Sequence, residues 1–257
     1  AMGLAGRSIG KVFCVKPKRK REQFAMNDQP LAQWTPPSLP ARIVLKGRYA
    51  CLEPLSQDHV EGLREAQRED TTDEMWAYLP VGPFDDAGYA AWVQANRLSH
   101  DPLHFAVRMA DGRLGGTLSL MRMTPGAGTI ETGWLTFAPR LQRTREATEA
   151  VYLLMKWAFE AGYRRFEWKC NAENAASRRA AQRFGFSYEG VFRQAGVVKG
   201  RNRDTAWFAA IDAEWPGLRA AFETWLAEDN FDETGAQKVR LGELTYPVLA
   251  AVDPSLE

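Results

Sequence analysis

Cysteine and histidine are scarce in this sequence, with three residues of each among 257. Cys14, Cys51 and Cys170 lie far apart, so they suit neither a disulfide framework nor a zinc site, and they favour a reducing, cytoplasmic compartment. The histidines form no close group with the cysteines, which argues against a metal enzyme. No run of uncharged apolar residues approaches the ~18 that a membrane span needs. We therefore expect no metal and no membrane partner.

Net charge is also nearly absent, because 33 Lys and Arg residues face 32 Asp and Glu residues. Such a balance gives no overall attraction to nucleic acids or anionic membranes. The hydrophobic share of 45% is ordinary for a soluble protein with a sizeable core. The length fits one large domain or two small ones.

The two ends of the chain carry opposite charge. Residues 1–25 contain seven Lys or Arg and one acid, and residues 226–257 contain seven acids and two bases. We predict a basic, proline-containing flexible arm over 1–41, a globular domain over 42–227 and a mobile acidic tail over 228–257. Contact with RNA is expected only through the arm, and the alternative for the arm is a disordered leader or sequence upstream of a start at Met26.

Strands and helices alternate in the middle of the chain. The most regular segments are an expected strand at 129–137, a helix at 148–161, a strand at 165–170, a helix at 174–184, and a hairpin of strands 186–198 and 205–211 around a turn at 199–204. In the short strand, Phe166, Trp168 and Cys170 share one face. This order predicts a mixed α/β fold in which some strands are antiparallel.

The loop at 139–146 joins a strand directly to the N-terminus of a helix. That arrangement gathers unpaired backbone N–H groups and the positive end of the helix dipole, which suits a phosphate. Arg140, Arg143 and Arg145 add positive charge. A solvated connection is the alternative interpretation.

Several motifs in the right order resemble the GCN5-related N-acetyltransferase (GNAT) superfamily, in its RimJ/RimL-like branch. They are Leu52-Glu53-Pro54-Leu55, Gly115-Gly116, the loop from Pro139 to Ala150, Asn174-Ala175-Ala176-Ser177, Arg183-Phe184-Gly185-Phe186 and Glu189-Gly190-Val191-Phe192-Arg193. The resemblance implies a strongly bent mixed sheet, flanked by helices and split between the strands at 130–137 and 165–170, with acetyl-CoA in the split. It also implies a set of acetyl-CoA-binding residues: Thr136, Phe137 and Ala138 for the pantetheine arm, Gln142, Arg143, Thr144, Arg145, Glu146 and Ala147 for the pyrophosphate, and Asn174 for a pantetheine amide.

The sequence departs from the family pattern at two positions. Arg145 stands where the family loop has glycine, so either the loop keeps negative φ and the guanidinium caps the phosphates, or CoA binding is lost. Ala181 stands where many relatives have a tyrosine that protonates the leaving thiolate. By the resemblance, Ser177 replaces that tyrosine, while the alternative is that Ser177 only satisfies backbone groups of its helix. Plain N-capping is likewise the alternative for Asn174.

Residues for the acceptor amine can be named as well. Family members often place an acid near the start of the strand at 129–137, so Glu131 is the expected base, with an exposed structural glutamate as the alternative. His104 is a second candidate base, or a structural histidine. Trp76, Tyr78 and Arg193 are expected in the acceptor pocket, although aromatic residues in loops can equally belong to the core.

These observations favour an acetyl-CoA-dependent N-acetyltransferase that acts by direct attack of a primary amine. The acceptor is either a protein N-terminus or a small-molecule amine, and the protein is a monomer or a homodimer. The competing interpretation is a degenerate acyl-CoA-binding or RNA-tethered module without activity, which the departures at Arg145 and Ala181 would suit.

Overall fold

The computed structural model describes residues 31–256, and the chain divides into two units between Trp34 and Thr35. The second unit contains the sheet and all features discussed below. The basic cluster expected in the N-terminal arm lies outside the described residues.

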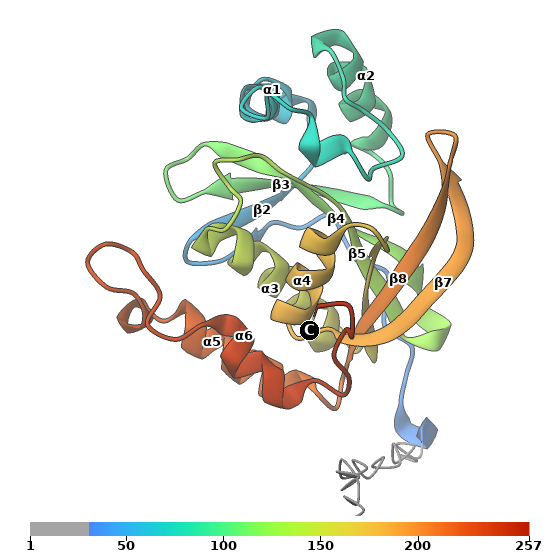
Figure 1. Ribbon diagram of the computed structural model, residues 1–257, viewed down its shortest axis with the longest axis vertical. Helices are drawn as coiled ribbons and strands as arrows, with labels where there is room; N and C mark the ends of the chain where they lie inside the picture. Colours follow the sequence, from blue (N-terminus) through green and yellow to red (C-terminus); the bar gives the residue numbers. More distant parts are fainter. Residues whose placement is uncertain (1–30, 257) are drawn as a thin grey trace, which may run out of the picture. The chain divides into compact units, whose positions relative to one another are not determined.

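One sheet of eight strands forms the centre of this unit, in the order β1-β2-β3-β4-β5-β6-β8-β7 (Figure 1). The strands are β1 Leu45–Lys46, β2 Ala50–Pro54, β3 Leu103–Met109, β4 Leu114–Thr124, β5 Thr129–Phe137, β6 Arg165–Asn171, β7 Ser187–Val198 and β8 Arg201–Ile211. Only β5 and β6 pair in parallel, and every other neighbouring pair is antiparallel. The mixed α/β fold is confirmed.

Helices cover both faces of the sheet. They are α1 Val60–Gln67, α2 Asp86–Asn96, α3 Arg145–Glu160, α4 Ala175–Arg183, α5 Trp215–Leu226 and α6 Leu241–Thr245. Figure 1 shows α3 on the opposite side of the sheet from α1 and α2. On β3, Phe105 and Val107 join the larger core with α3, whereas Ala106 joins a smaller core with α1 and α2. Side chains of a strand alternate between its faces, so β3 is buried on both.

Local sequence signals account for the elements that border the site. The alternation in β6 is confirmed, with Phe166, Trp168 and Cys170 buried. Asn174 caps α4 by accepting the N–H of Ser177. The hairpin differs from the expectation because its turn is only Lys199-Gly200, and β8 begins at Arg201, four residues earlier than expected.

The sheet splits where β5 and β6 diverge. Their pairing runs from Thr129 opposite Arg165 to Thr132 opposite Trp168 and then stops. Beyond Thr132, β5 stays paired with β4, and the edge of β5 that faced β6 has no strand partner. A positive φ of 53° at Trp134 marks a bulge at this point, because two β5 residues between Gly133 and Thr136 oppose one on β4. The split expected from the resemblance is confirmed.

The acidic C-terminal segment is folded rather than mobile. Leu241 in α6 is fully buried, and α6 packs on α5. Asp253 is also fully buried, and its carboxylate accepts two hydrogen bonds from the Arg178 guanidinium at 2.6 and 2.7 Å. The expectation of a mobile tail was wrong because net charge says nothing of the apolar residues spaced among the acids, such as Phe231 on Trp225.

Candidate active site

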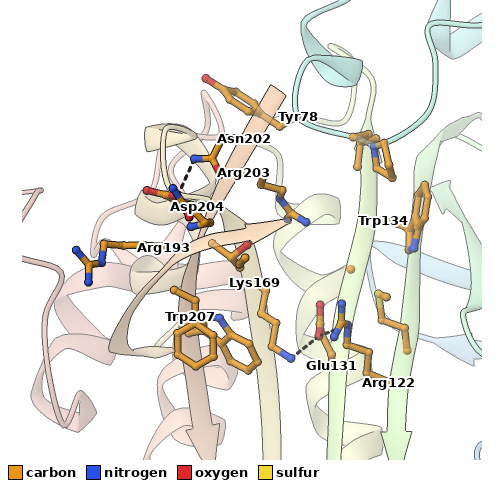
Figure 2. Close-up of a pocket in the computed structure, with 18 residues that line it drawn as sticks. Tyr78, Arg122, Glu131, Trp134, Lys169, Arg193, Asn202, Arg203, Asp204 and Trp207 are labelled. Carbon is orange, nitrogen blue, oxygen red and sulfur yellow. Dashed lines mark hydrogen bonds and ion pairs between the residues drawn. The ribbon is translucent and has the colours of Figure 1, made fainter. Parts of the chain in front are cut away.

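A pocket of about 1080 Å³ opens at the split of the sheet (Figure 2). Residues of β4, β5, β6, β7 and β8 line it, together with the segment that joins α1 to α2. The lining residues are Tyr78, Leu79, Pro80, Met121, Arg122, Glu131, Gly133, Trp134, Lys169, Phe192, Arg193, Gln194, Ala195, Asn202, Arg203, Asp204, Thr205 and Trp207.

Glu131 is the buried carboxylate of this pocket, with a relative exposure of 4%. Its Oε2 lies 2.9 Å from the Nζ of Lys169 and 3.4 Å from the Nε of Arg122. Burial raises the pKa of Glu131 above its ordinary value, and the Lys169 ammonium partly offsets that rise. The alternative interpretation, an exposed strand glutamate, is therefore excluded.

The bulge in β5 changes which side chains face the pocket. Strict alternation predicts that Trp134 lies on the face opposite to Glu131 and Gly133. The structure places all three in the pocket lining. The positive φ at Trp134 interrupts the alternation, and the sequence prediction of opposite faces is therefore wrong for this residue.

Two long-range hydrogen bonds join the walls of the pocket. Lys199 at the tip of the β7–β8 hairpin donates from Nζ to the Trp76 carbonyl at 2.9 Å, and the Tyr78 hydroxyl donates to the Glu173 carbonyl at 3.4 Å. The segment between α1 and α2 thus reaches the opposite half of the sheet. Tyr78 lines the pocket as expected, and so does Arg193.

Trp76 and His104 lie in the core rather than in the pocket lining. The Trp76 ring is 4% exposed and meets Phe84 edge-on at 5.3 Å. His104 is 1% exposed, lies between Trp92 and Trp134, and has its pKa lowered to about 4, chiefly by burial. For both residues the structural interpretation is the one that the geometry supports.

The unpaired edge of β5 ends in a tight turn. The Ala138 N–H donates to the Gly115 carbonyl, and the Ala138 carbonyl accepts from the N–H groups of Leu141 and Gln142. Both backbone groups of Ala138 are therefore used inside the protein, unlike the expectation that they bind a pantetheine arm. The Thr136 side chain is held by the Thr117 hydroxyl at 2.6 Å.

Close approach of β4 keeps this edge in place. Gly116 has a φ of 153°, and a Cβ atom there would collide with the Thr136 carbonyl oxygen. Only glycine fits this position, because the Cβ atom of any other residue would push β4 away from β5 at Thr136.

The loop before α3 has three backbone N–H groups without an acceptor among residues 31–256. They belong to Arg143, Arg145 and Glu146. The N–H of Thr144 donates to the Leu141 carbonyl, and that of Ala147 donates to the Thr144 hydroxyl. The anion-binding groups are therefore fewer than the expected run from Arg143 to Ala147.

Side chains of the loop have structural partners. Gln142 donates from Nε2 to the Phe137 carbonyl at 2.8 Å, which closes the turn. The positive φ falls on Arg143, at 63°, and Arg145 is the first residue of α3. The replacement of the family glycine by Arg145 therefore leaves the helical start of α3 intact.

The guanidinium of Arg145 stacks on aromatic rings. It lies 4.2 Å from the centroid of Phe231 and 5.2 Å from that of Tyr49. This placement does not support capping of phosphates by the Arg145 side chain. In this geometry, the group of Arg145 that can bind an anion is its backbone N–H.

We expect Arg145→Ala to lower the free energy of unfolding by about 1 kcal/mol, because it removes these cation–π contacts. The KM for acetyl-CoA should change less than twofold. Urea denaturation and steady-state kinetics measure the two quantities, and a large rise in KM at unchanged stability would restore the capping role.

Ser177 lies in the first turn of α4, where β6 has left β5. Its hydroxyl oxygen accepts the indole N–H of Trp168 at 3.0 Å. Asn174 Oδ1 accepts the Ser177 N–H at 2.9 Å, as plain N-capping requires. Burial raises the pKa of the Cys170 thiol. A raised pKa disfavours the thiolate, so Cys170 is poorly suited to act as a nucleophile.

Sequence reasoning missed several pocket residues, notably Lys169, Arg203 and Trp207. A signal was available for the last two, since Arg203, Thr205 and Trp207 alternate along β8 and so share one face. Lys169 likewise lies on the face of β6 opposite to the apolar residues.

Within residues 31–256, no three His, Cys, Asp or Glu residues gather in a way that could hold a metal ion. None of the helices in that range has the length and apolar character needed to cross a bilayer.

The comparisons with known proteins all point to one family. The family model described as an acetyltransferase (GNAT) domain matches residues 50–187. A GCN5-related N-acetyltransferase from Brucella melitensis is 45% identical, with a TM-score of 0.80, over 83% of this chain and 99% of that one. A GNAT-family protein from Chromobacterium violaceum is 41% identical, with a TM-score of 0.68, over 72% of this chain and 94% of that one.

More distant structures share the fold. One is the Salmonella typhimurium acetyltransferase that modifies the N-terminal serine of a 50S ribosomal subunit protein. It is 23% identical, with a TM-score of 0.57, over 66% of this chain and 99% of that one. The search of curated protein sequences finds no match. The split sheet, the loop before α3 and the match over residues 50–187 together show that the chain belongs to the GNAT acetyltransferase family.

Proposed function

We propose that this protein transfers an acetyl group from acetyl-CoA to a primary amine, on a protein N-terminus or a small molecule, by direct attack of the amine on the thioester. The observation that carries the proposal is the position of Glu131. Its buried carboxylate lines the pocket at the point where β5 leaves β6 and its edge becomes free.

The residues at the split fit an acetyl-CoA co-substrate. The β5 edge from Gly133 to Phe137 has no partner among the described strands and can bond the amides of a pantetheine arm as an added strand would, although the Phe137 carbonyl is already taken by Gln142. The unpaired N–H groups of Arg143, Arg145 and Glu146, at the positive end of the α3 dipole, suit the pyrophosphate. Asn174 has its Oδ1 engaged by Ser177, so its amide NH₂ group is what remains for a pantetheine carbonyl.

Acetyl-CoA supplies the activated acetyl group as a thioester, and the protein must supply a neutral amine. An ammonium group cannot attack, because its lone pair holds a proton. We propose that Glu131 takes that proton, directly or through one water. The new bond joins the amine nitrogen to the acetyl carbon, and the bond from that carbon to sulfur breaks. The nitrogen then loses its second proton, and the CoA thiolate gains one and leaves as the free thiol.

We propose that Ser177 assists the departing sulfur. Its oxygen already accepts from Trp168, and its own proton can point toward a thiolate at the N-terminal end of α4.

Removal of this hydroxyl tests the role. We expect Ser177→Ala to lower kcat by about tenfold and to leave the Kd for acetyl-CoA unchanged, because the donor acts on the leaving group. Pre-steady-state kinetics and calorimetry measure the two effects. Wild-type turnover would reduce Ser177 to a residue that only bonds Trp168.

The activity itself is tested by two measurements on the same preparation. Acetyl-CoA should raise the melting temperature in a concentration-dependent way. A panel of peptide N-termini and small amines should then release free CoA thiol. Stabilisation without thiol release from any amine would favour a binding module over an enzyme.

A further inference from the structure

The pocket holds more positive than negative side chains, and within residues 31–256 neither Arg193 nor Arg203 has an ion-pair or side-chain hydrogen-bond partner. Arg122, Lys169, Arg193 and Arg203 line it, against the carboxylates of Glu131 and Asp204. Arg122 and Lys169 both lie within ion-pair distance of Glu131. Arg122, Lys169 and Glu131 therefore form one ion-paired group, in which Lys169 also pairs with Glu167.

Asp204 is occupied by its own hairpin. Its Oδ1 accepts the Gln194 N–H at 2.7 Å and the Asn202 side-chain amide at 2.9 Å. It forms no ion pair with Arg203 in the described part of the chain. Figure 2 shows Arg193 pointing away from Glu131 and Lys169, whereas the Arg203 side chain extends from β8 toward β5.

Arg203 thus carries an uncompensated charge into the pocket. Its Nε is buried and has no hydrogen-bond partner among residues 31–256, and the same holds for the indole nitrogen of Trp207 on the same face of β8. Buried donors without acceptors are costly, and natural proteins usually supply the acceptor. A guanidinium is the side chain best matched to a carboxylate, because its planar fork donates two parallel hydrogen bonds.

The spacing along β8 places this charge at some distance from the reacting amine. Trp207 lies opposite Lys169 in the ladder, and Lys169 contacts Glu131. Arg203 lies four residues farther along β8, which is roughly 13 Å at about 3.3 Å per residue. Even with the reach of the arginine side chain, a group bound there lies one to three residues of extended chain from the amine.

We infer that the preferred acceptor is a peptide N-terminus with an acidic side chain at its second or third residue, which Arg203 binds. This inference rests on the proposed acetyl transfer and adds the substrate class. The α-carboxylate of a free amino acid would lie too near its own amine to reach Arg203. The pocket volume of about 1080 Å³ lies at the upper end of the usual range for ligand pockets, which leaves room for the first residues of a peptide.

The test compares the peptide amides Ala-Asp-Asp-Ala-Ala and Ala-Asn-Asn-Ala-Ala, which are isosteric and differ in charge. We expect the wild type to favour the Asp peptide in kcat/KM by roughly tenfold or more. Arg203→Gln should bring the ratio near one by slowing the Asp peptide alone. Arg201→Gln is the matched control, because Arg201 is exposed on the same hairpin and outside the pocket lining, and it should keep the wild-type ratio.

A binding measurement separates this inference from the proposed activity. The N-acetylated forms of both peptides are titrated by calorimetry in the presence of CoA. An Arg203-dependent preference for the acetylated Asp peptide, without turnover of either free peptide, would keep the inference and reject the proposed function. A ratio near one in the wild type, or a preference that Arg203→Gln leaves intact, would overturn the inference. Discrimination of free glutamate from glutamine through Arg203, with none between the peptides, would also overturn it in favour of a small acceptor.

Discussion

Glu131→Gln should lower kcat/KM for amine acetylation by about a hundredfold, because general bases contribute 10²–10⁴ to the rate. The amide is nearly isosteric with the carboxylate and cannot accept the proton of the amine. The KM for acetyl-CoA should change little, since Glu131 lies on the pocket side of the split rather than on the loop before α3. Steady-state kinetics at saturating acetyl-CoA measure the loss.

Glu167→Gln provides the matched control. Glu167 also contacts Lys169, at 2.6 Å, but does not line the pocket. If the loss in Glu131→Gln arose only from freeing Lys169, both variants would lose activity alike. The proposed base predicts that Glu167→Gln retains activity within a few-fold of the wild type.

The pH dependence gives an independent check on Glu131. A base works only when ionised, so activity should fall as pH drops through its pKa. Burial raises the pKa of Glu131, which places this acidic limb above the value of ~4.3 for an exposed glutamate. An α-amino acceptor titrates at ~7.7–8.0 in both proteins, so the difference between the wild-type and Glu131→Gln profiles isolates the carboxylate. Identical profiles would remove Glu131 as the base.

Glu149→Ala should lower the free energy of unfolding by about 2–4 kcal/mol, more than any other substitution proposed for this protein. Glu149 is a buried carboxylate of α3 that accepts the backbone N–H groups of Arg48, Tyr49 and Ala50 at 2.8, 2.6 and 2.7 Å. Alanine would leave these donors without their acceptor. The same contact fixes α3, whose first turn forms the proposed pyrophosphate site, against the turn between β1 and β2.

Chemical denaturation measures the effect, and two further variants give it meaning. Glu149→Gln keeps one acceptor oxygen and should cost less than Glu149→Ala. Glu160→Ala, at the exposed end of the same helix, should stay within ~0.5 kcal/mol of the wild type. Equal losses in Glu149→Ala and Glu160→Ala would show that helix propensity, and not the buried carboxylate, sets the stability of this region.

Local sequence patterns predicted most of the fold. The strand 129–137 has the expected bounds, and the alternation in 165–170 follows from burial of every second residue on one side of β6. Glu131 and Tyr78 were both named from the sequence, and both line the pocket. The split itself came from the resemblance, because no local pattern tells where two parallel strands cease to pair.

Features that depend on tertiary contacts were not predictable in this way. The bulge at Trp134 moves a side chain to the other face, and the positive φ falls on Trp134 rather than on the neighbouring Gly133. The role of Arg145 depends on Phe231, which lies 86 positions later in a segment expected to be mobile. Arg203 was hidden by the expected turn at 199–204, whereas the actual turn is two residues long and places Arg203 within the strand.

A crystal structure of the protein with CoA tests the proposed binding mode most directly. We expect the pantetheine arm along β5 between Gly133 and Phe137, with pyrophosphate oxygens at the N–H groups of Arg143, Arg145 and Glu146. Density for CoA at any other surface, with the β5 edge unoccupied, would contradict this binding mode.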